Sequence, residues 1–73
     1  MTWYAIWENE PKRGQIVLIT DRYGRMRVMS YKGKMENTTS NYKFAKIDYP
    51  EIYHGYLACD FRWTEIDSLP KFD

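Results

Sequence analysis

The sequence has few of the residues from which catalytic and metal sites are usually built. Its 73 residues include one cysteine, Cys59, and one histidine, His54. An internal disulfide needs two cysteines, and a structural zinc site needs four ligands, so neither is available. Nothing in their spacing marks His54 and Cys59 as a nucleophilic pair, and the four isolated glycines form no phosphate-binding loop. We therefore expect a protein that is not an enzyme and that has no cofactor and no metal.

Long apolar runs are missing as well. The longest, residues 16–19, is far too short to span a membrane. Residues 1–10 lack the basic start and apolar stretch of a signal peptide. Together with the unpaired cysteine, these features predict a cytoplasmic protein with no membrane partner.

Aromatic residues are abundant by contrast, with 13 tryptophan, tyrosine and phenylalanine residues in the 73. A chain this short forms one domain, residues 1–73, with a small hydrophobic core. Such a core needs most of its aromatic side chains for its own stability. We expect Trp3, Phe61 and Trp63 in the core, whereas other aromatic residues are left for a partner.

Hydrophobic patterning predicts a mainly β fold, a small antiparallel sheet of about four or five strands that is rolled or half-open, with at most one short helical turn. The predicted strands are residues 2–7, 15–20, 25–32, 43–47 and 61–67. Turns are predicted at residues 11–14 and 21–24, and loops at residues 33–42 and 48–56. Within residues 25–32, the pattern favours an inward face of Met26, Val28 and Ser30, with Met29 and Tyr31 on the outward face.

Charge is divided unevenly along the chain, although the net charge is only +1. Residues 11–34 contain seven basic residues and one acid, whereas residues 47–73 contain two basic residues and six acids. Arginine binds phosphate and tyrosine stacks on bases, so the basic hairpin is a candidate surface for nucleic acid or for an acidic protein partner. Its candidate residues are Arg22, Tyr23, Arg25, Arg27, Tyr31, Lys32 and Lys34.

A second candidate surface is the tyrosine-rich segment with acidic neighbours that follows residue 48. Tyrosine is enriched at protein interfaces because it gives a large contact area with few rotatable bonds. The candidate partner-binding residues are Tyr49, Glu51, Tyr53, His54 and Tyr56. The alternative is that these tyrosines only cover the core.

The two ends of the chain resemble a small domain-of-unknown-function family that is common in tailed phages and prophages. The resemblance lies in Trp3, in residues 11–19 (Pro-x-x-Gly-Gln-x-Val-Leu-Ile), in Tyr31 and in residues 63–70, which run from a tryptophan to Leu-Pro. It implies a compact β-rich fold and a phage origin, and with it the cytoplasm of the host cell. Residues 33–59 match no part of that family.

Small phage proteins are often inhibitors of host machinery, so the function expected by association is binding and inhibition of a host protein. A nuclease or another defence component is the favoured target, in the manner of an anti-CRISPR or anti-restriction protein. The alternative is a nucleic-acid-binding accessory domain that uses the hairpin at residues 22–34. A homodimer formed through the sheet edges is also left open.

Overall fold

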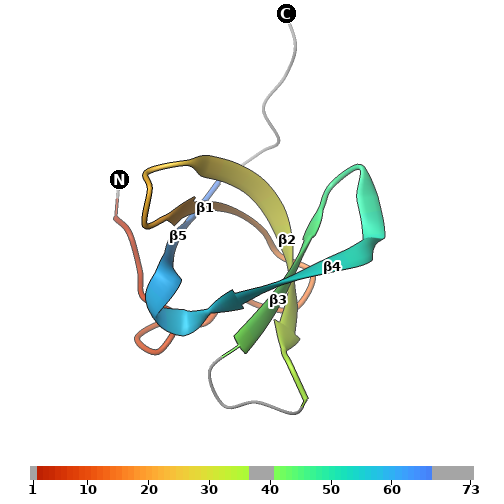
Figure 1. Cartoon of the computed structure of the whole chain (residues 1–73), viewed down its shortest axis with the longest axis horizontal. Coiled ribbons are helices and arrows are strands. Elements are labelled where there is room, and N and C mark those ends of the chain that lie inside the picture. Colours follow the sequence, from red (N-terminus) through yellow and green to blue (C-terminus); the bar gives the residue numbers. More distant parts are fainter. Residues whose placement is uncertain (1, 37–40, 67–73) are drawn as a thin grey trace, which may run out of the picture.

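The computed structural model describes residues 2–36 and 41–66, and within them the protein is one antiparallel five-stranded sheet (Figure 1). The strands are β1 (Ile16–Asp21), β2 (Met26–Lys34), β3 (Asn41–Lys46), β4 (Tyr49–Leu57) and β5 (Phe61–Glu65), with a 3₁₀ turn, η1 (Ala58–Asp60), before β5. Their order across the sheet is β4-β3-β2-β1-β5. The predicted fold class is therefore confirmed.

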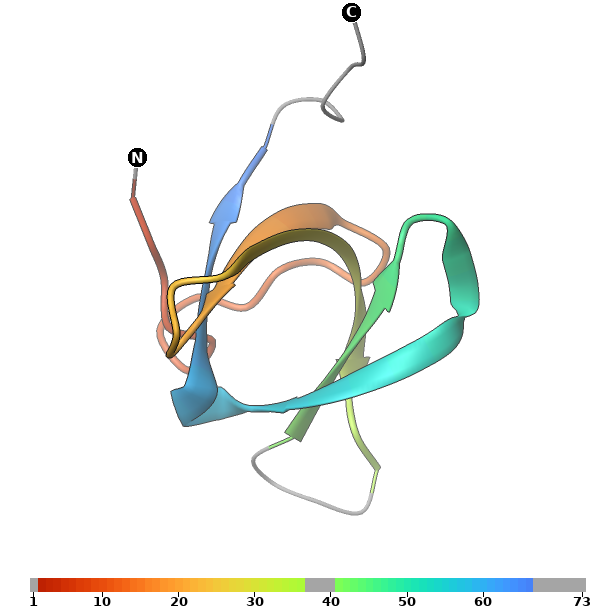
Figure 2. The same cartoon turned by 45° about the horizontal axis from the view of Figure 1, so that its top comes forward.

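The sheet is strongly curled because its two outermost strands are consecutive in the chain. β4 and β5 lie at opposite ends of the strand order, yet only the three residues of η1 connect them. The sheet has to bend round until the end of β4 meets the start of β5 (Figure 2). In both views the far part of the β3–β4 hairpin projects from the curled body.

Aromatic side chains fill the concave side of the sheet. Phe44 on β3 lies at their centre, with ring centroids 5.2 Å from Tyr31, 5.2 Å from Phe61 and 5.7 Å from Tyr56. Phe61 also contacts Tyr56 at 5.9 Å, so an aromatic pair links the two outermost strands. The buried cluster comprises Ile6, Val17, Ile19, Met29, Tyr31, Phe44, Phe61 and Trp63.

The inward face of β2 is the opposite of the one predicted. Met29 and Tyr31 are fully buried, whereas Met26 is exposed and Val28 and Ser30 are only partly buried. Tyrosine is compatible with this burial because the Tyr31 hydroxyl donates a hydrogen bond to Glu10 Oε2 at 2.7 Å. The predicted face was wrong because residues 25–31 carry apolar side chains on both faces.

The N-terminal segment is a strap beside β5 and not the predicted strand at residues 2–7. Of the described residues in this segment, only Tyr4 pairs with β5, through two backbone hydrogen bonds with Trp63 of 2.7 and 3.0 Å. A turn then begins, in which the backbone N–H groups of Glu8 and Asn9 donate to the Ala5 carbonyl. Trp63 is buried as predicted, and its indole N–H donates to the Asn9 carbonyl at 2.7 Å. Trp3 is only partly buried and does not belong to the buried cluster.

The remaining boundaries differ from the predictions mainly in the second half of the chain. The predicted loop at residues 48–56 is wrong, because it is almost entirely strand β4. The predicted loop at residues 33–42 is shorter than expected, because β2 extends to Lys34 and β3 begins at Asn41. Residues 37–40 of this loop and residue 67 of the last predicted strand lie outside the described residues. The turns at residues 11–14 and 21–24 are confirmed, with φ values of 86° at Gly14 and 81° at Gly24.

Within residues 2–36 and 41–66, no helix is long and apolar enough to cross a membrane.

Replacing the central ring of the core should unfold much of the protein. We expect Phe44→Ala to lower the free energy of unfolding by about 3–5 kcal/mol, because the side chain is fully buried and its removal leaves a cavity. Ile52→Ala is the matched control, since that side chain is half exposed on β4 and its loss should cost under about 0.5 kcal/mol. Urea denaturation followed by circular dichroism measures both, and equal midpoints for the two variants would contradict the assignment of Phe44 to the centre of the core.

Candidate functional site

The free side of β4 is the most distinctive surface of the described chain. β4 pairs with β3 on one side, and no described strand pairs with the other. An unpaired strand edge presents a row of backbone N–H and C=O groups that can pair with another extended chain. β4 is nine residues long and most of its residues are exposed, so this edge is accessible to a partner.

A bulge divides β4 into two parts. Tyr53 pairs with Ala45 and Tyr49 pairs with Lys46, so residues 50–52 have no opposite residues on β3. Pro50, which has no N–H to donate, is tolerated in this unpaired part. The regular pairing edge is therefore residues 53–57, and the bulged residues project beside it.

The β3–β4 hairpin exposes several large apolar side chains around this edge. Tyr49 is 55% exposed, Ile52 51% and Tyr53 55%. Tyr49 and Ile52 line an open hollow of about 290 Å³ together with Lys46 and His54, and the surface of this hollow is almost entirely apolar. The hollow could accept an apolar side chain of a strand that pairs beside it.

Two basic side chains of β3 flank the apolar residues. The Lys43 ammonium group lies 5.3 Å from the centre of the Tyr53 ring, a cation–π contact. Lys46 lines the hollow on the other part of the hairpin. A partner segment at this edge would thus meet apolar contacts bordered by positive charge.

Four of the five predicted partner-binding residues lie along the free edge of β4, on both faces of the strand. Tyr49, Glu51 and Tyr53 are exposed on β4 and His54 is half-buried in the hollow. Tyr56 instead packs against the core rings, and its hydroxyl lies 3.7 Å from Met29 Sδ. Tyr56 therefore has a structural role, whereas the other four form the candidate site, which we call the β4 edge site together with Lys43, Lys46 and Ile52.

The basic hairpin is not the continuous positive surface that the sequence predicted. Arg22 forms an ion pair with Asp60 of η1, which raises the pKa of the guanidinium. Arg25 Nε lies 2.9 Å from Asp21 Oδ2, and the guanidinium carbon is 5.4 Å from the centre of the Tyr23 ring. Desolvation raises the pKa of Asp21, but hydrogen bonds from Arg25 and from the Tyr23 N–H outweigh it and lower the pKa overall.

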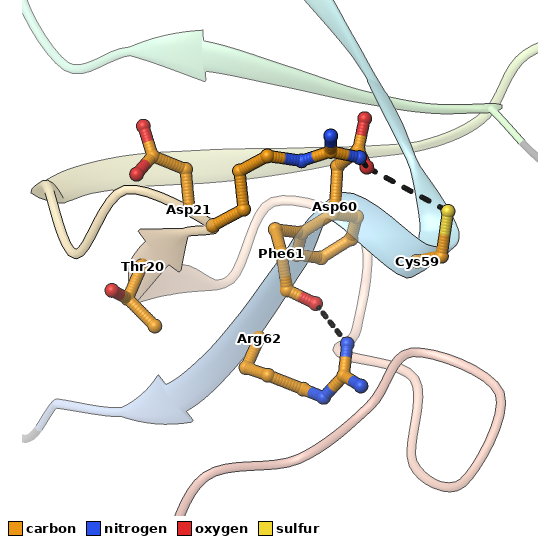
Figure 3. A pocket seen from close by; sticks show the side chains of 7 residues that line it. Thr20, Asp21, Cys59, Asp60, Phe61 and Arg62 are labelled. Atoms are coloured by element: carbon orange, nitrogen blue, oxygen red, sulfur yellow. Dashed lines mark hydrogen bonds and ion pairs between the residues drawn. The ribbon is translucent and has the colours of Figure 1, made fainter.

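An open hollow of about 280 Å³ lies beside these ion pairs (Figure 3). It is lined by residues 20–22 of the hairpin and residues 59–62 around η1, and the exposed Cys59 thiol donates a weak hydrogen bond to Asp60 Oδ1 at 3.6 Å. Carboxylates pair with Arg22 and Arg25, and Arg62, which also lines the hollow, donates to the Phe61 carbonyl, so two of these three guanidinium groups are already paired with an acid.

The other predicted hairpin residues lie elsewhere. Tyr31 is fully buried, so it cannot contact nucleic acid or a partner. Lys32 and Lys34 are at the opposite end of β2 from Arg27, with Arg27 and Lys34 roughly 23 Å apart along the strand. Tyr23 and Arg27 are exposed. The predicted patch is thus split between the two ends of the sheet.

Sequence reasoning missed three residues of the β4 edge site, namely Lys43, Lys46 and Ile52. Ile52 lies in the segment predicted as a loop, whereas Lys43 and Lys46 lie in the strand predicted at residues 43–47, whose cross-strand neighbours the sequence does not indicate. It also missed the exposed Trp7, whose ring lies 4.9 Å from the Arg62 guanidinium carbon.

Neither a metal site nor a similarity to a known protein helps to define the function of this surface. In the described parts of the chain, no group of three or more histidine, cysteine, aspartate or glutamate residues is placed to hold a metal ion. His54 and Cys59 line different hollows. Comparison with family models, curated proteins and solved structures found no significant match.

The buried Tyr31 hydroxyl should make stability sensitive to alkaline pH. Desolvation and the hydrogen bond to Glu10 raise the pKa of Tyr31 above its ordinary value of 10.0. Above about pH 10 the unfolded chain therefore loses a proton that the folded chain keeps, so stability falls as pH rises. We expect Tyr31→Phe to cost about 1 kcal/mol at pH 8 through the lost hydrogen bond, but to show a shallower loss between pH 10 and 11.5. Urea denaturation across this range measures both slopes, and parallel pH profiles would show that Tyr31 does not titrate in this way.

Proposed function

We propose that the protein is a non-catalytic binding domain that captures an extended segment of a partner protein along the β4 edge site. The observation that carries this proposal is the coincidence of an unpaired strand edge with three exposed apolar side chains, Tyr49, Ile52 and Tyr53. In strand addition, backbone hydrogen bonds supply affinity, and pockets for alternate side chains supply specificity.

The composition of the site supports a protein partner. Tyrosine and isoleucine at the centre can act as anchors, while the lysines at the margin keep the surface soluble. Lys43 and Lys46 favour a partner segment that carries acidic residues beside its apolar ones. Only residues 53–57 offer regular backbone pairing, so the captured segment pairs over about five residues.

The proposal extends to inhibition of a host protein. Support for this part comes from the sequence resemblance to phage and prophage proteins, which favours a defence nuclease or a similar effector as the target. A strand captured on β4 is held away from its own functional contacts, so binding would block the partner without any reaction. The second candidate, a nucleic-acid-binding hairpin at residues 22–34, is less favoured because Arg22 and Arg25 are paired with carboxylates.

The binding mode is tested with a displayed library of random peptides panned against the folded protein. We expect enrichment of extended peptides that alternate apolar with polar residues and carry acidic side chains. The double variant Ile52→Glu/Tyr53→Glu should weaken binding more than tenfold, because it places charge where apolar contacts are made. Hydrogen exchange should show added protection of β4 amides when peptide binds.

Tyr23→Glu is the control, since Tyr23 is more exposed than Tyr53 but lies on the β1–β2 turn. It should leave peptide binding unchanged. Peptides that bind the Ile52→Glu/Tyr53→Glu variant as well as the parent, or protection confined to another strand, would refute capture at the β4 edge site.

The inhibitory role is tested in bacterial cells that carry a restriction or CRISPR system with a plasmid target. Expression of the parent protein should raise plasmid survival, and the Ile52→Glu/Tyr53→Glu variant should not. Survival equal to that without the protein, across the systems tested, would count against a defence effector as the target while leaving the peptide result intact.

A further inference from the structure

A second charged surface lies at the end of the sheet opposite the β1–β2 turn. Five cationic residues from three segments lie at this end, which we call the basic end, and they are distributed over both faces of the sheet. They are Lys12 and Arg13 on the turn before β1, Lys32 and Lys34 at the end of β2, and Lys43 on β3.

Backbone hydrogen bonds hold these segments side by side. The Gly14 N–H donates to the Tyr31 carbonyl at 2.7 Å, and the Tyr31 N–H donates to the Gln15 carbonyl at 2.9 Å. The turn itself is closed by the Gln15 N–H, which donates to the Lys12 carbonyl at 2.9 Å. Lys12 and Arg13 are therefore fixed next to the last residues of β2.

A bulge in β2 brings Arg13 and Lys43 onto one face. Tyr31 pairs with Phe44 and Gly33 pairs with Lys43, so Lys32 is the extra residue. Gly33 has a φ of 106°, which favours glycine, and a side chain there would meet Arg13 Nε at 2.8 Å. The Arg13 guanidinium thus lies over the position that Gly33 leaves empty. Because directly paired residues share a face, it lies on the same face as Lys43.

The positive charge of the basic end is not neutralised by ion pairs. Both ion pairs found among the described residues, Arg22–Asp60 and Arg25–Asp21, lie at the other end of the sheet. Two described acids are near the basic end. Glu10 accepts the Tyr31 hydrogen bond, and Glu36 follows β2. Five cations against two acids leave a clear excess of positive charge.

The two segments that carry four of the five cations have no exposed apolar anchor, which favours phosphate over protein as the ligand. Protein interfaces are depleted in lysine and depend on buried aromatic or apolar anchors. Among the described residues, no large apolar side chain that is exposed falls within residues 12–15 or 32–36. Spread cationic side chains instead match the regular negative charge of a phosphate backbone. Tyr53, which lies under Lys43, borders the surface and could stack on an unpaired base.

We propose that the basic end binds the phosphate backbone of a nucleic acid, at the end of the sheet opposite Arg22, Arg25 and Arg27 and with only Lys43 shared with the β4 edge site. Fluorescence anisotropy with a labelled single-stranded DNA of about 20 nucleotides, and with its duplex, tests this over 50–200 mM salt. Neutralisation of five phosphates predicts a slope of log K against log salt of roughly −3.5 for the single strand and −4.5 for the duplex. The tighter of the two probes identifies the form of nucleic acid.

Two double charge reversals with the same change of net charge locate the site. Lys12→Glu/Lys34→Glu alters two exposed side chains of the basic end, and should weaken binding at least tenfold and reduce the steepness of the salt slope by about 1.5. Arg25→Glu/Arg27→Glu alters the hairpin and should change affinity less than threefold. Circular dichroism confirms that both variants fold.

Three results would overturn the proposal. The first is no binding of either DNA at 50 mM salt. The second is a loss of DNA affinity in Arg25→Glu/Arg27→Glu that equals or exceeds the loss in Lys12→Glu/Lys34→Glu, which would place the binding site on the hairpin. The third is displacement of DNA by polyglutamate of equal charge as efficiently as by unlabelled DNA, which would identify an acidic protein as the ligand.

Discussion

The contact of Phe61 with Phe44 and Tyr56 is the interaction on which the rest of the structure depends. These rings come from β5, β3 and β4, and neither β3 nor β4 is a hydrogen-bonded neighbour of β5. They meet only because the sheet curls, and the sheet can curl because apolar surface is buried when they meet. In a domain this small, one aromatic cluster provides both the core and the curvature.

This curvature also determines which surfaces remain for partners. Near η1 the curled sheet brings β4 close to β5, so Tyr56 packs against the core and is not available to a partner. Tyr53, three residues earlier, stays exposed. Elsewhere in the sheet, the bulge at Lys32 and Gly33 pairs Gly33 with Lys43 and leaves space for the Arg13 side chain over Gly33. The proposed protein capture and the proposed phosphate binding thus use two surfaces that adjoin at Lys43, each placed by an irregularity in an otherwise regular sheet.

The sequence predicted the class of fold and the first hairpin because their determinants are local. Alternation in residues 15–20 and the Asp-Arg-Tyr-Gly turn act over a few residues. The inward face of β2 was not predictable in this way, since Met26 and Met29 are equally apolar and only the cross-strand partners and the Glu10 hydrogen bond distinguish the faces. β4 was mistaken for a loop because Pro50 and Gly55 interrupt its pattern, and the structure tolerates both on an outermost strand.

The candidate sites show the same division between local and distant determinants. Tyr49, Glu51, Tyr53 and His54 could be grouped from composition, because they are adjacent in the chain. The neutralisation of Arg22 could not, since Asp60 is 38 residues away and reaches it only when β5 pairs with β1. For the same reason Lys43 could not be joined with Arg13 before the register of β2 and β3 was known.

The bulge at residues 50–52 has a consequence for the behaviour of the protein at high concentration. An open strand edge with exposed tyrosine and isoleucine side chains invites copies of a chain to add to one another without end, as in amyloid. Here the regular part of the edge ends at Tyr53, and Pro50 cannot donate a backbone hydrogen bond beyond it. Strand pairing that started on residues 53–57 would therefore extend over only a few residues. This is enough for a short captured segment, but it gives a growing fibril no continuous template.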